Sequence, residues 1–430
     1  MKKTRTEVGH MSSAIRFIHS ADLHLDSLFK TKGDLPAALL EKLRASTFEA
    51  FDRLIEACLY HEVDFLLIAG DLYNEEMRSL KAQVHLRRGF ERLEEKGIHV
   101  FMGYGNHDYT KGAKYPITFP DHVHIFSGET VESFVYEKKG EQLARIYGFS
   151  YENREVRGRK VQEYQPVGNS FYHIAMLHGS LETNTDHDVY APFSMEELKN
   201  KGMDYWALGH IHKRESLSDD PPIIYPGNIQ GRSRKEPGEK GCYLIEHQEG
   251  IWTTEFLPLH SFTYEAARAS CDHIEEPQEL EGVLEEIKKR FLKTETAVML
   301  TITLSSKAGK LRYWWMEGIV QEWMDLVNEA EDLDRQDWVW VEQIIIEDRP
   351  AWNEEELVNS HHFTGELLRT VHQVDEEQLE EWLTPLFSHR KVSKYVQPLS
   401  EEEKQEAIEM AKSLTVERLL GSEGGNLENS

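Results

Sequence analysis

The sequence contains few of the features that a secreted or membrane protein needs. It has three cysteines, Cys58, Cys242 and Cys271, and none of them belongs to a CxxC pair. An odd number at such spacings favours reduced thiols in a cytoplasmic protein over a disulfide framework. No apolar run is long enough to span a bilayer, and no apolar segment follows the basic residues at the start. We therefore expect a cytoplasmic location, without a membrane anchor or a signal peptide.

Positive charge is scarce as well. The chain has 49 Lys and Arg against 76 Asp and Glu, a net charge of −27. Residues 1–260 carry 32 basic against 39 acidic side chains, whereas residues 261–430 carry 17 against 37. The acidity therefore lies mostly in the second part, and tight, salt-insensitive DNA binding by this chain alone is not expected. Two basic clusters remain, for which solvated loops and phosphate contacts are both open interpretations: Arg154, Arg157, Arg159 and Lys160, and Arg232, Arg234 and Lys235.

The sequence does contain one repeated pattern of apolar runs. Five short apolar runs, separated by helical stretches, predict buried strands that begin near residues 15, 65, 100, 174 and 205. Side chains at the carboxyl ends of such strands meet in the crevice where open α/β sheets place their active sites. Residue types that bind metal ions end or follow every one of these runs: Asp22, His24, Asp71, Asn106, His107, Asp108, His178, His210 and His212.

The remaining periodicities complete a predicted architecture. Apolar residues at helical spacing predict helices at about 36–61, 78–96, 277–292 and 313–330. Strands of period two are predicted within 121–149, and further strands over 297–304 and 338–346. The fold class is therefore α/β, a two-sheet sandwich flanked by helices and followed by a small α+β module. The tryptophans of that module either stack on bases or pack in a core: Trp314, Trp315, Trp323, Trp338 and Trp340.

The last part of the chain is acidic and helical. One predicted helix, which Pro385 should kink, has an apolar stripe of Leu379, Trp382, Leu383, Leu386 and Phe387. A capping box of Ser400 and Glu403 starts a further helix that carries Ile408, Ala411, Leu414 and Leu419. Such amphipathic helices dock either on their own domain or on the helices of a partner.

The order of the motifs, D-x-H, G-D, G-N-H-D, H-G and G-H-x-H, closely resembles the calcineurin-like metallophosphoesterase superfamily and, within it, the SbcD-type DNA-repair exonucleases. The stretch YPGNIQGR at 225–232, followed by KGC at 240–242, looks nearest to their YhaO branch. This resemblance implies a metallophosphoesterase (nuclease) domain over 14–260, an α+β capping or adaptor domain over 261–350 and a helical partner-binding region over 351–420. Residues 1–13 are expected to be a leader or disordered, and 421–430 a disordered tail.

The resemblance also implies two divalent metal ions. The first would be held by Asp22, His24, Asp71 and His212, and the second by Asp71, Asn106, His178 and His210, with Asp71 as the bridge. Oxygen and imidazole ligands without thiolate suit manganese, which we expect, with iron, magnesium or zinc as alternatives. In D-x-H and H-x-H both side chains project from the same side of an extended segment, so both reach one site. His107 would protonate the leaving oxygen, and Asp108 would orient its imidazole.

Together these implications predict a metal-dependent phosphodiesterase, a DNA exonuclease that acts on DNA ends with an SbcC-like coiled-coil ATPase on its C-terminal helices. One residue departs from the family pattern. SbcD-type nucleases usually carry a histidine three residues after the bridging aspartate, and this chain has Asn74, which can hydrogen-bond a phosphate but cannot carry charge. A low-activity scaffold subunit of such an ATPase complex and a small-nucleotide phosphoesterase stay open as alternative functions, and so does a homodimer.

Overall fold

The computed structural model describes most of the chain, namely residues 14–29, 35–74, 78–111, 117–183, 190–292, 296–307, 310–348, 354–374, 376–387, 399–400 and scattered positions between 404 and 419. The predicted leader, Glu403 of the predicted capping box and the predicted tail lie outside the described residues. The chain divides into two compact units. One contains the chain up to Glu265 with Phe291–Met299 and Asp332–Trp340, and the other contains Ala266–Arg290, Leu300–Glu331 and the chain from Val341.

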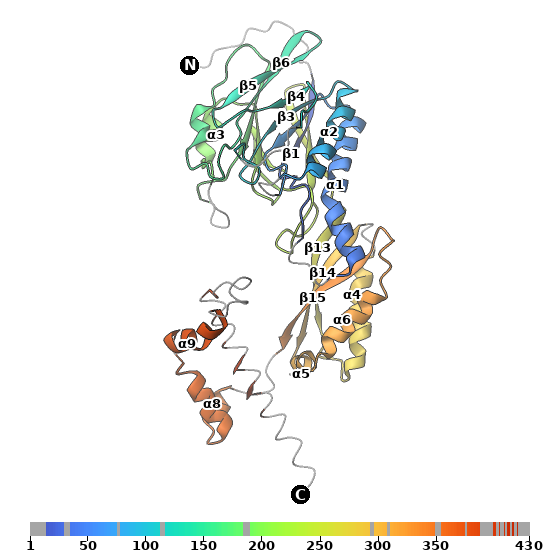
Figure 1. Ribbon diagram of the computed structural model, residues 1–430, viewed down its shortest axis with the longest axis vertical. Coiled ribbons are helices and arrows are strands. Elements are labelled where there is room, and N and C mark those ends of the chain that lie inside the picture. Colours follow the sequence, from blue (N-terminus) through green and yellow to red (C-terminus); the bar gives the residue numbers. More distant parts are fainter. Residues whose placement is uncertain are drawn as a thin grey trace. The chain divides into compact units, whose positions relative to one another are not determined.

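Two six-stranded sheets form the first unit (Figure 1). The first sheet has the order β12 (Ile251–Pro258), β11 (Gly241–Gln248), β1 (Ile15–Ser20), β2 (Phe65–Ala69), β3 (His99–Gly103) and β4 (Val123–Ile125). The second has the order β5 (Glu132–Lys138), β6 (Glu141–Gly148), β7 (Tyr172–His178), β8 (Tyr205–Gly209), β10 (Pro222–Tyr225) and β9 (Glu215–Asp219). The predicted α/β sandwich of two sheets is confirmed.

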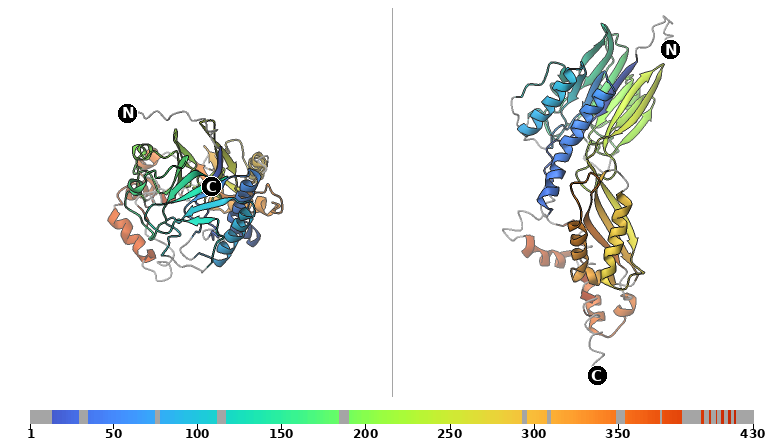
Figure 2. Two further views of the ribbon diagram at one scale, coloured as in Figure 1. Left: turned by 90° about the horizontal axis from the view of Figure 1, so that it is seen from above. Right: turned by 90° about the vertical axis from the view of Figure 1, so that its right-hand side faces the viewer.

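Alternation along the strands explains the layers of the sandwich. All five residues of β2 are buried, with Phe65 and Leu67 in the core between the sheets and Leu66 and Ile68 in the core on the opposite face. That opposite face is covered by α1 (Ala37–Tyr60) and α2 (Leu80–Glu94), which lie side by side in Figures 1 and 2. The outer face of the second sheet packs against a short helix, α3 (Met195–Asn200). A strand buried on both faces needs a continuous apolar run, which is why the sequence identified these strands.

The parallel pairing of the strands places the predicted ligands at common edges. β1, β2 and β3 pair in parallel within the first sheet, and β7 and β8 pair in parallel within the second. Their carboxyl ends therefore lie at one edge of each sheet, and the residues that follow them form loops along that edge. His178 is the last residue of β7 and lies in register with Gly209, the last residue of β8.

A three-stranded sheet follows the sandwich, with the order β13 (Phe262–Ser270), β14 (Ala297–Ser306) and β15 (Val339–Asp348). Its helices are α4 (Leu280–Phe291), α5 (Lys310–Met316) and α6 (Ile319–Glu329). The single helix predicted over 313–330 is wrong, because Gly318 adopts a left-handed backbone with φ 80° and separates α5 from α6. Trp314, Trp338 and Trp340 are buried, as core packing requires, whereas Trp315 is 45% exposed.

Among the described residues beyond β15 are the helices α7 (Glu354–Val358), α8 (Phe363–Val371) and α9 (Glu376–Phe387), the last with Pro385 in its interior. The predicted apolar stripe lies on α9, where Leu379 is 8% exposed and Trp382 is 63% exposed. The side chain of Leu386 is not among those described. No helix of the described chain is long and apolar enough to cross a membrane. The boundaries at residues 260, 350 and 420 stay predictions.

Candidate metal centre

Four of the predicted ligands lie on left-handed backbone. Their φ angles are 52° at Asp22, 43° at His24, 52° at Asp71 and 96° at His210. A residue other than glycine rarely adopts such angles, and each instance costs about 1–3 kcal/mol unless the surroundings hold it. Here the loops hold one another, since Asp22 N–H donates to the Gly70 carbonyl over 3.1 Å and His24 N–H donates to the Asp71 carbonyl over 3.0 Å. The bends bring ligands from different strands to one place.

The first group of predicted ligands converges on one point. Single ligand atoms of Asp22, His24, Asp71 and His212 all lie within 4.8 Å of one another. The Nε2 atoms of His24 and His212 are 3.1 Å apart. His212 Nδ1 lies 2.7 Å from Glu236 Oε1 and donates its hydrogen there, so the lone pair of the ring is on Nε2 and faces His24. Two buried carboxylates and two imidazoles in this arrangement fit a divalent cation.

The second group is joined by the amide of Asn106. His178 Nδ1 lies 2.9 Å from the Ala69 carbonyl oxygen and donates to it, so the lone pair of this ring is on Nε2. That Nε2 faces Asn106 Oδ1 at 2.9 Å, and the same oxygen lies 3.2 Å from His210 Nδ1. Burial holds the pKa of His178 below its usual value, so the ring stays neutral. The nitrogen and oxygen lone pairs that face each other here repel, and a cation between them would remove that repulsion.

Asp71 belongs to both groups through a single oxygen. Its Oδ2 lies 3.7 Å from His24 Nε2 and 3.5 Å from His178 Nε2. Its Oδ1 accepts the backbone N–H of His107 over 3.0 Å, which fixes the carboxylate plane. The structure therefore brings all seven predicted ligands together and leaves Asp71 between the two sets. Their role as ligands remains a prediction.

Gly105 leaves room for this arrangement. A Cβ atom at Gly105 would lie 2.7 Å from His178 Nε2 and closer still to Asp71 Oδ1. Real Cβ atoms essentially never approach that closely. The two facing side chains belong to predicted ligands and are held in place by hydrogen bonds of Asp71 Oδ1 and His178 Nδ1. The residue before Asn106 must therefore be glycine if both side chains are to point at the centre.

Burial and neighbouring charges set the protonation of the acids. Burial raises the pKa of Asp22 well above its usual range, and the Asp71 carboxylate adds to that rise. Burial also acts to raise the pKa of Asp71, but His178, His107 with its backbone N–H, and His210 together hold that pKa below its usual value. The Asp71 carboxylate is thus kept ionised. Burial lowers the pKa values of the neighbouring His24 and His212 imidazoles. A shared carboxylate in this state suits a cation on either side.

His107 and Asp108 differ in their relation to the centre. The His107 ring lies edge-on to that of His24, with centroids 5.1 Å apart, so it borders the first group. Asp108 was predicted to orient the His107 imidazole, but its described hydrogen bonds go elsewhere. Its Oδ2 accepts the N–H groups of Leu72 at 2.7 Å and Tyr73 at 3.3 Å, and its Oδ1 accepts Gly105 N–H at 2.7 Å. Asp108 therefore holds the two loops of the centre together, because its carboxylate accepts backbone N–H groups from both.

Sequence reasoning missed Glu236. Besides His212 Nδ1, its carboxylate accepts Asn228 Nδ2 over 3.0 Å and the backbone N–H of Arg232 over 2.7 Å. These bonds fix the ring orientation of His212, as carboxylates behind metal-bound histidines do. Glu236 lies in a polar loop without apolar periodicity, and 24 residues separate it from His212 in the sequence. Only the fold brings the two side chains together, so no local sequence signal identifies Glu236.

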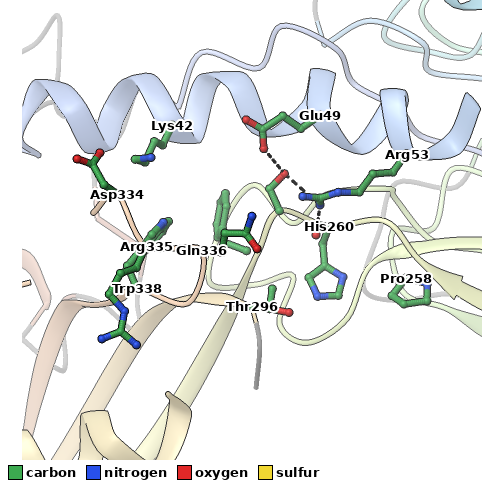
Figure 3. Close-up of a pocket in the computed structure, with 12 residues that line it drawn as sticks. Lys42, Glu49, Arg53, Pro258, His260, Thr296, Asp334, Arg335, Gln336 and Trp338 are labelled. Atoms are coloured by element: carbon green, nitrogen blue, oxygen red, sulfur yellow. Dashed lines mark hydrogen bonds between the residues drawn. The ribbon is translucent and has the colours of Figure 1, made fainter. Parts of the chain in front are cut away.

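A cavity of about 450 Å³ lies elsewhere in the first unit (Figure 3). Its lining includes Lys42, Glu49 and Arg53 of α1 and none of the predicted ligands. Some of the polar groups drawn there bind one another, since Arg53 donates to Ser261 Oγ over 3.3 Å and Ser261 donates to Glu49 over 2.7 Å. The chemistry of the chain therefore points to the edge of the strands and not to this cavity.

The fold and the ligand set define a class of protein. Residues 15–214 match the calcineurin-like phosphoesterase family. The chain is 37% identical over 413 residues to the uncharacterized metallophosphoesterase YhaO of Bacillus subtilis (strain 168), an alignment that covers 95% of this chain and 99% of that protein. The chain belongs to the calcineurin-like metallophosphoesterases. The prediction of that family, nearest to YhaO, is confirmed.

More distant relatives are DNA-repair proteins. The chain is 26% identical over 259 residues to the DNA double-strand break repair protein Mre11 of Methanopyrus kandleri, covering 55% of each chain. It is 26% identical over 245 residues to the protein of the same name from Methanocaldococcus jannaschii, covering 54% of this chain and 62% of that one. Together with the family match, these relatives bear out the prediction of a metal-dependent phosphodiesterase.

Proposed function

We propose that this chain hydrolyses phosphodiester bonds at DNA ends and does so with two divalent ions, most simply manganese. The observation that carries the proposal is the position of Asp71 Oδ2, between His24 Nε2 at 3.7 Å and His178 Nε2 at 3.5 Å. A carboxylate oxygen between two imidazole-containing groups is the arrangement that a bridging ligand needs. We propose the first group, Asp22, His24, Asp71 and His212, for one ion and the second, Asp71, Asn106, His178 and His210, for the other.

The roles of the side chains follow from their chemistry. When bound there, two divalent ions supply Lewis-acid activation of the phosphoryl group and of water. Asn106 offers a neutral amide oxygen, which limits negative charge beside the phosphate. His107 borders the first group and is the side chain that would give a proton to the leaving oxygen. Asp108 and Glu236 would keep the loops and the His212 ring in place.

DNA as substrate is supported by the Mre11 relatives, whose names refer to DNA double-strand break repair. We further propose that residues 14–260 catalyse, that 261–350 form a capping or adaptor domain and that 351–420 bind an SbcC-like ATPase. The exposed indole of Trp382 on α9 supports a partner surface, because a large aromatic side chain at 63% exposure is typical of an interface anchor.

A manganese-dependent assay on linear DNA tests the proposal. The full chain is assayed with and without the ATPase, on labelled linear duplex and on a chromogenic diester. Cleavage of both substrates by the chain with manganese supports the proposal, and stimulation by the ATPase supports the partner. Hydrolysis of the small diester alone would instead favour a small-nucleotide phosphoesterase. Activity on neither substrate, with capture of the ATPase intact, would favour a scaffold subunit.

A further inference from the structure

Arg232 reaches the candidate metal centre from a segment far away in sequence. Its Nη1 donates to Asn74 Oδ1 over 2.7 Å, and Asn74 lies three residues after Asp71. Its Nη2 lies 3.2 Å from His212 Nδ1 and 3.4 Å from Glu236 Oε1. The guanidinium therefore spans the space between the loop that carries Asp71 and the ring of His212.

The His212 ring separates this guanidinium from the ligand cluster. Nε2 of His212 faces His24 at 3.1 Å, whereas Nδ1, on the other side of the ring, faces Arg232. A phosphate bound at the cluster would thus lie one imidazole away from Arg232. On a nucleic-acid strand, the anionic group that lies about this far from the bound phosphate is the neighbouring phosphate.

The charge of Arg232 is only partly balanced. Its hydrogen bond of 2.7 Å goes to the neutral amide of Asn74. The carboxylate that it contacts among the described residues, Glu236, is also bound by His212 and Asn228. Lys240 adds a second cation by donating from Nζ to the His212 carbonyl over 3.1 Å. In the other basic cluster, Arg157, Arg159 and Lys160 each form a shorter ion pair with a glutamate than the 3.4 Å contact between Arg232 and Glu236.

Asn74 positions the guanidinium of Arg232. Its Oδ1 accepts from Arg232, which fixes the amide and leaves the NH₂ group on the other branch as a donor. An asparagine lacks charge, but a guanidinium bound to it supplies one, and 19% of the Arg232 side chain is exposed. Guanidinium groups bind phosphate oxygens through paired N–H donors in a fixed plane.

We propose that Arg232 binds a non-bridging oxygen of the phosphate that flanks the scissile one, with Asn74 as its positioning residue. The proposal rests on the proposed function and makes the pair a determinant of specificity for polynucleotides over small diesters. Arg232 touches the substrate in this arrangement, whereas Asn74 acts through Arg232.

The test compares Arg232→Gln with Arg234→Gln, a change of equal charge at an exposed arginine of the same loop. The manganese-loaded full chain is titrated with a labelled phosphorothioate oligonucleotide, and Kd is measured by fluorescence anisotropy over a range of salt. Arg232→Gln should weaken binding about tenfold or more, as expected for a hydrogen bond to a charged group. It should also reduce the slope of log Kd against log salt by about 0.7–0.9, the value for one phosphate contact. Arg234→Gln should bind the oligonucleotide with the same Kd and salt slope as the wild-type chain.

A second variant separates substrate binding from support of His212. Asn74→Asp keeps the guanidinium in place but neutralises it, so it should weaken oligonucleotide binding and reduce the salt slope while metal content stays unchanged. Unchanged Kd and salt slope in both Arg232→Gln and Asn74→Asp would overturn the proposal, as would equal losses on the small diester with loss of metal. Lack of diesterase activity in the unchanged chain contradicts the proposed function instead, because the binding measurement does not depend on turnover.

Discussion

Asp108 accepts the backbone N–H of Leu72 over 2.7 Å and so ties the loop after β3 to the loop after β2. The loop after β3 carries Asn106, which belongs to the second group of predicted ligands. The loop after β2 carries Asp71, which belongs to both groups. The centre is therefore held by backbone hydrogen bonds to one buried carboxylate, and not only by the strands that lead into it.

Asp71→Asn should remove both metal ions, because one carboxylate oxygen faces both groups and an amide cannot supply its charge. Metal content per chain is measured after dialysis. Asp121→Asn, at an exposed position, is the matched control and should keep its ions. Two ions per chain in the Asp71 variant would mean that Asp71 is not the bridge.

Gly105→Ala should empty the centre while leaving the sandwich folded. The added Cβ meets His178 Nε2 and Asp71 Oδ1, so the two side chains must turn away from the ions. We expect loss of metal and of diester hydrolysis with an unchanged far-UV spectrum. Gly158→Ala is the control, because its Cβ meets nothing within 4 Å. Full metal loading in the Gly105 variant would contradict the geometry described.

His107→Ala should retain the ions and lose most of the turnover, by roughly 10²–10⁴-fold if the imidazole transfers a proton. The ring borders the first group without belonging to the predicted ligands. Rates on DNA and on a chromogenic diester are compared at equal metal content. His273→Ala removes an exposed imidazole and serves as control. Equal rates in the two variants would exclude His107 from the mechanism.

His124 should make stability fall at acid pH. Its ring lies on β4 with Nε2 3.0 Å from His99 Nδ1, and burial together with His99 and His122 lowers its pKa to about 4. Because the folded pKa is depressed, the stabilisation is present above the unfolded value near 6.5 and is lost as pH falls toward 4. His124→Phe should therefore narrow the difference in Tm between pH 8 and pH 5, measured with EDTA present. An unchanged difference would show that His124 does not titrate on unfolding.

Trp382→Ala should weaken capture of the ATPase by about 2 kcal/mol or more, since interface hot spots centre on aromatic side chains. Hydrolysis of a small diester should hardly change, because the predicted ligands all precede residue 260. Trp315→Ala, at another exposed tryptophan, is the control. If Trp382→Ala unfolds the chain, while a variant that folds still captures the ATPase fully, the stripe on α9 is part of the chain's own core.

Features with a local signal in the sequence could be predicted, whereas contacts between distant residues could not. The strands before Asp71 and His210 were visible because burial on both faces requires unbroken apolar runs, and their ligands follow at once. Gly318 broke a predicted helix because one glycine can adopt φ 80° without a change in the apolar spacing around it. The contact of Arg232 with Asn74 joins residues 158 apart, and no periodicity records such a distance. The hydrogen bonds of Asp108 to Leu72 and Tyr73 were missed for a similar reason, since these partners are backbone groups of another loop, and its predicted orienting role stays a prediction.

The left-handed backbone at Asp22, His24, Asp71 and His210 has a consequence for engineering. Glycine or asparagine would adopt those φ angles more easily than the residues present. Variants chosen for heat resistance alone would therefore tend to replace the very side chains that gather at the strand ends. A programme to make this chain more robust should hold these four positions constant and seek its gains in the helices and outer loops.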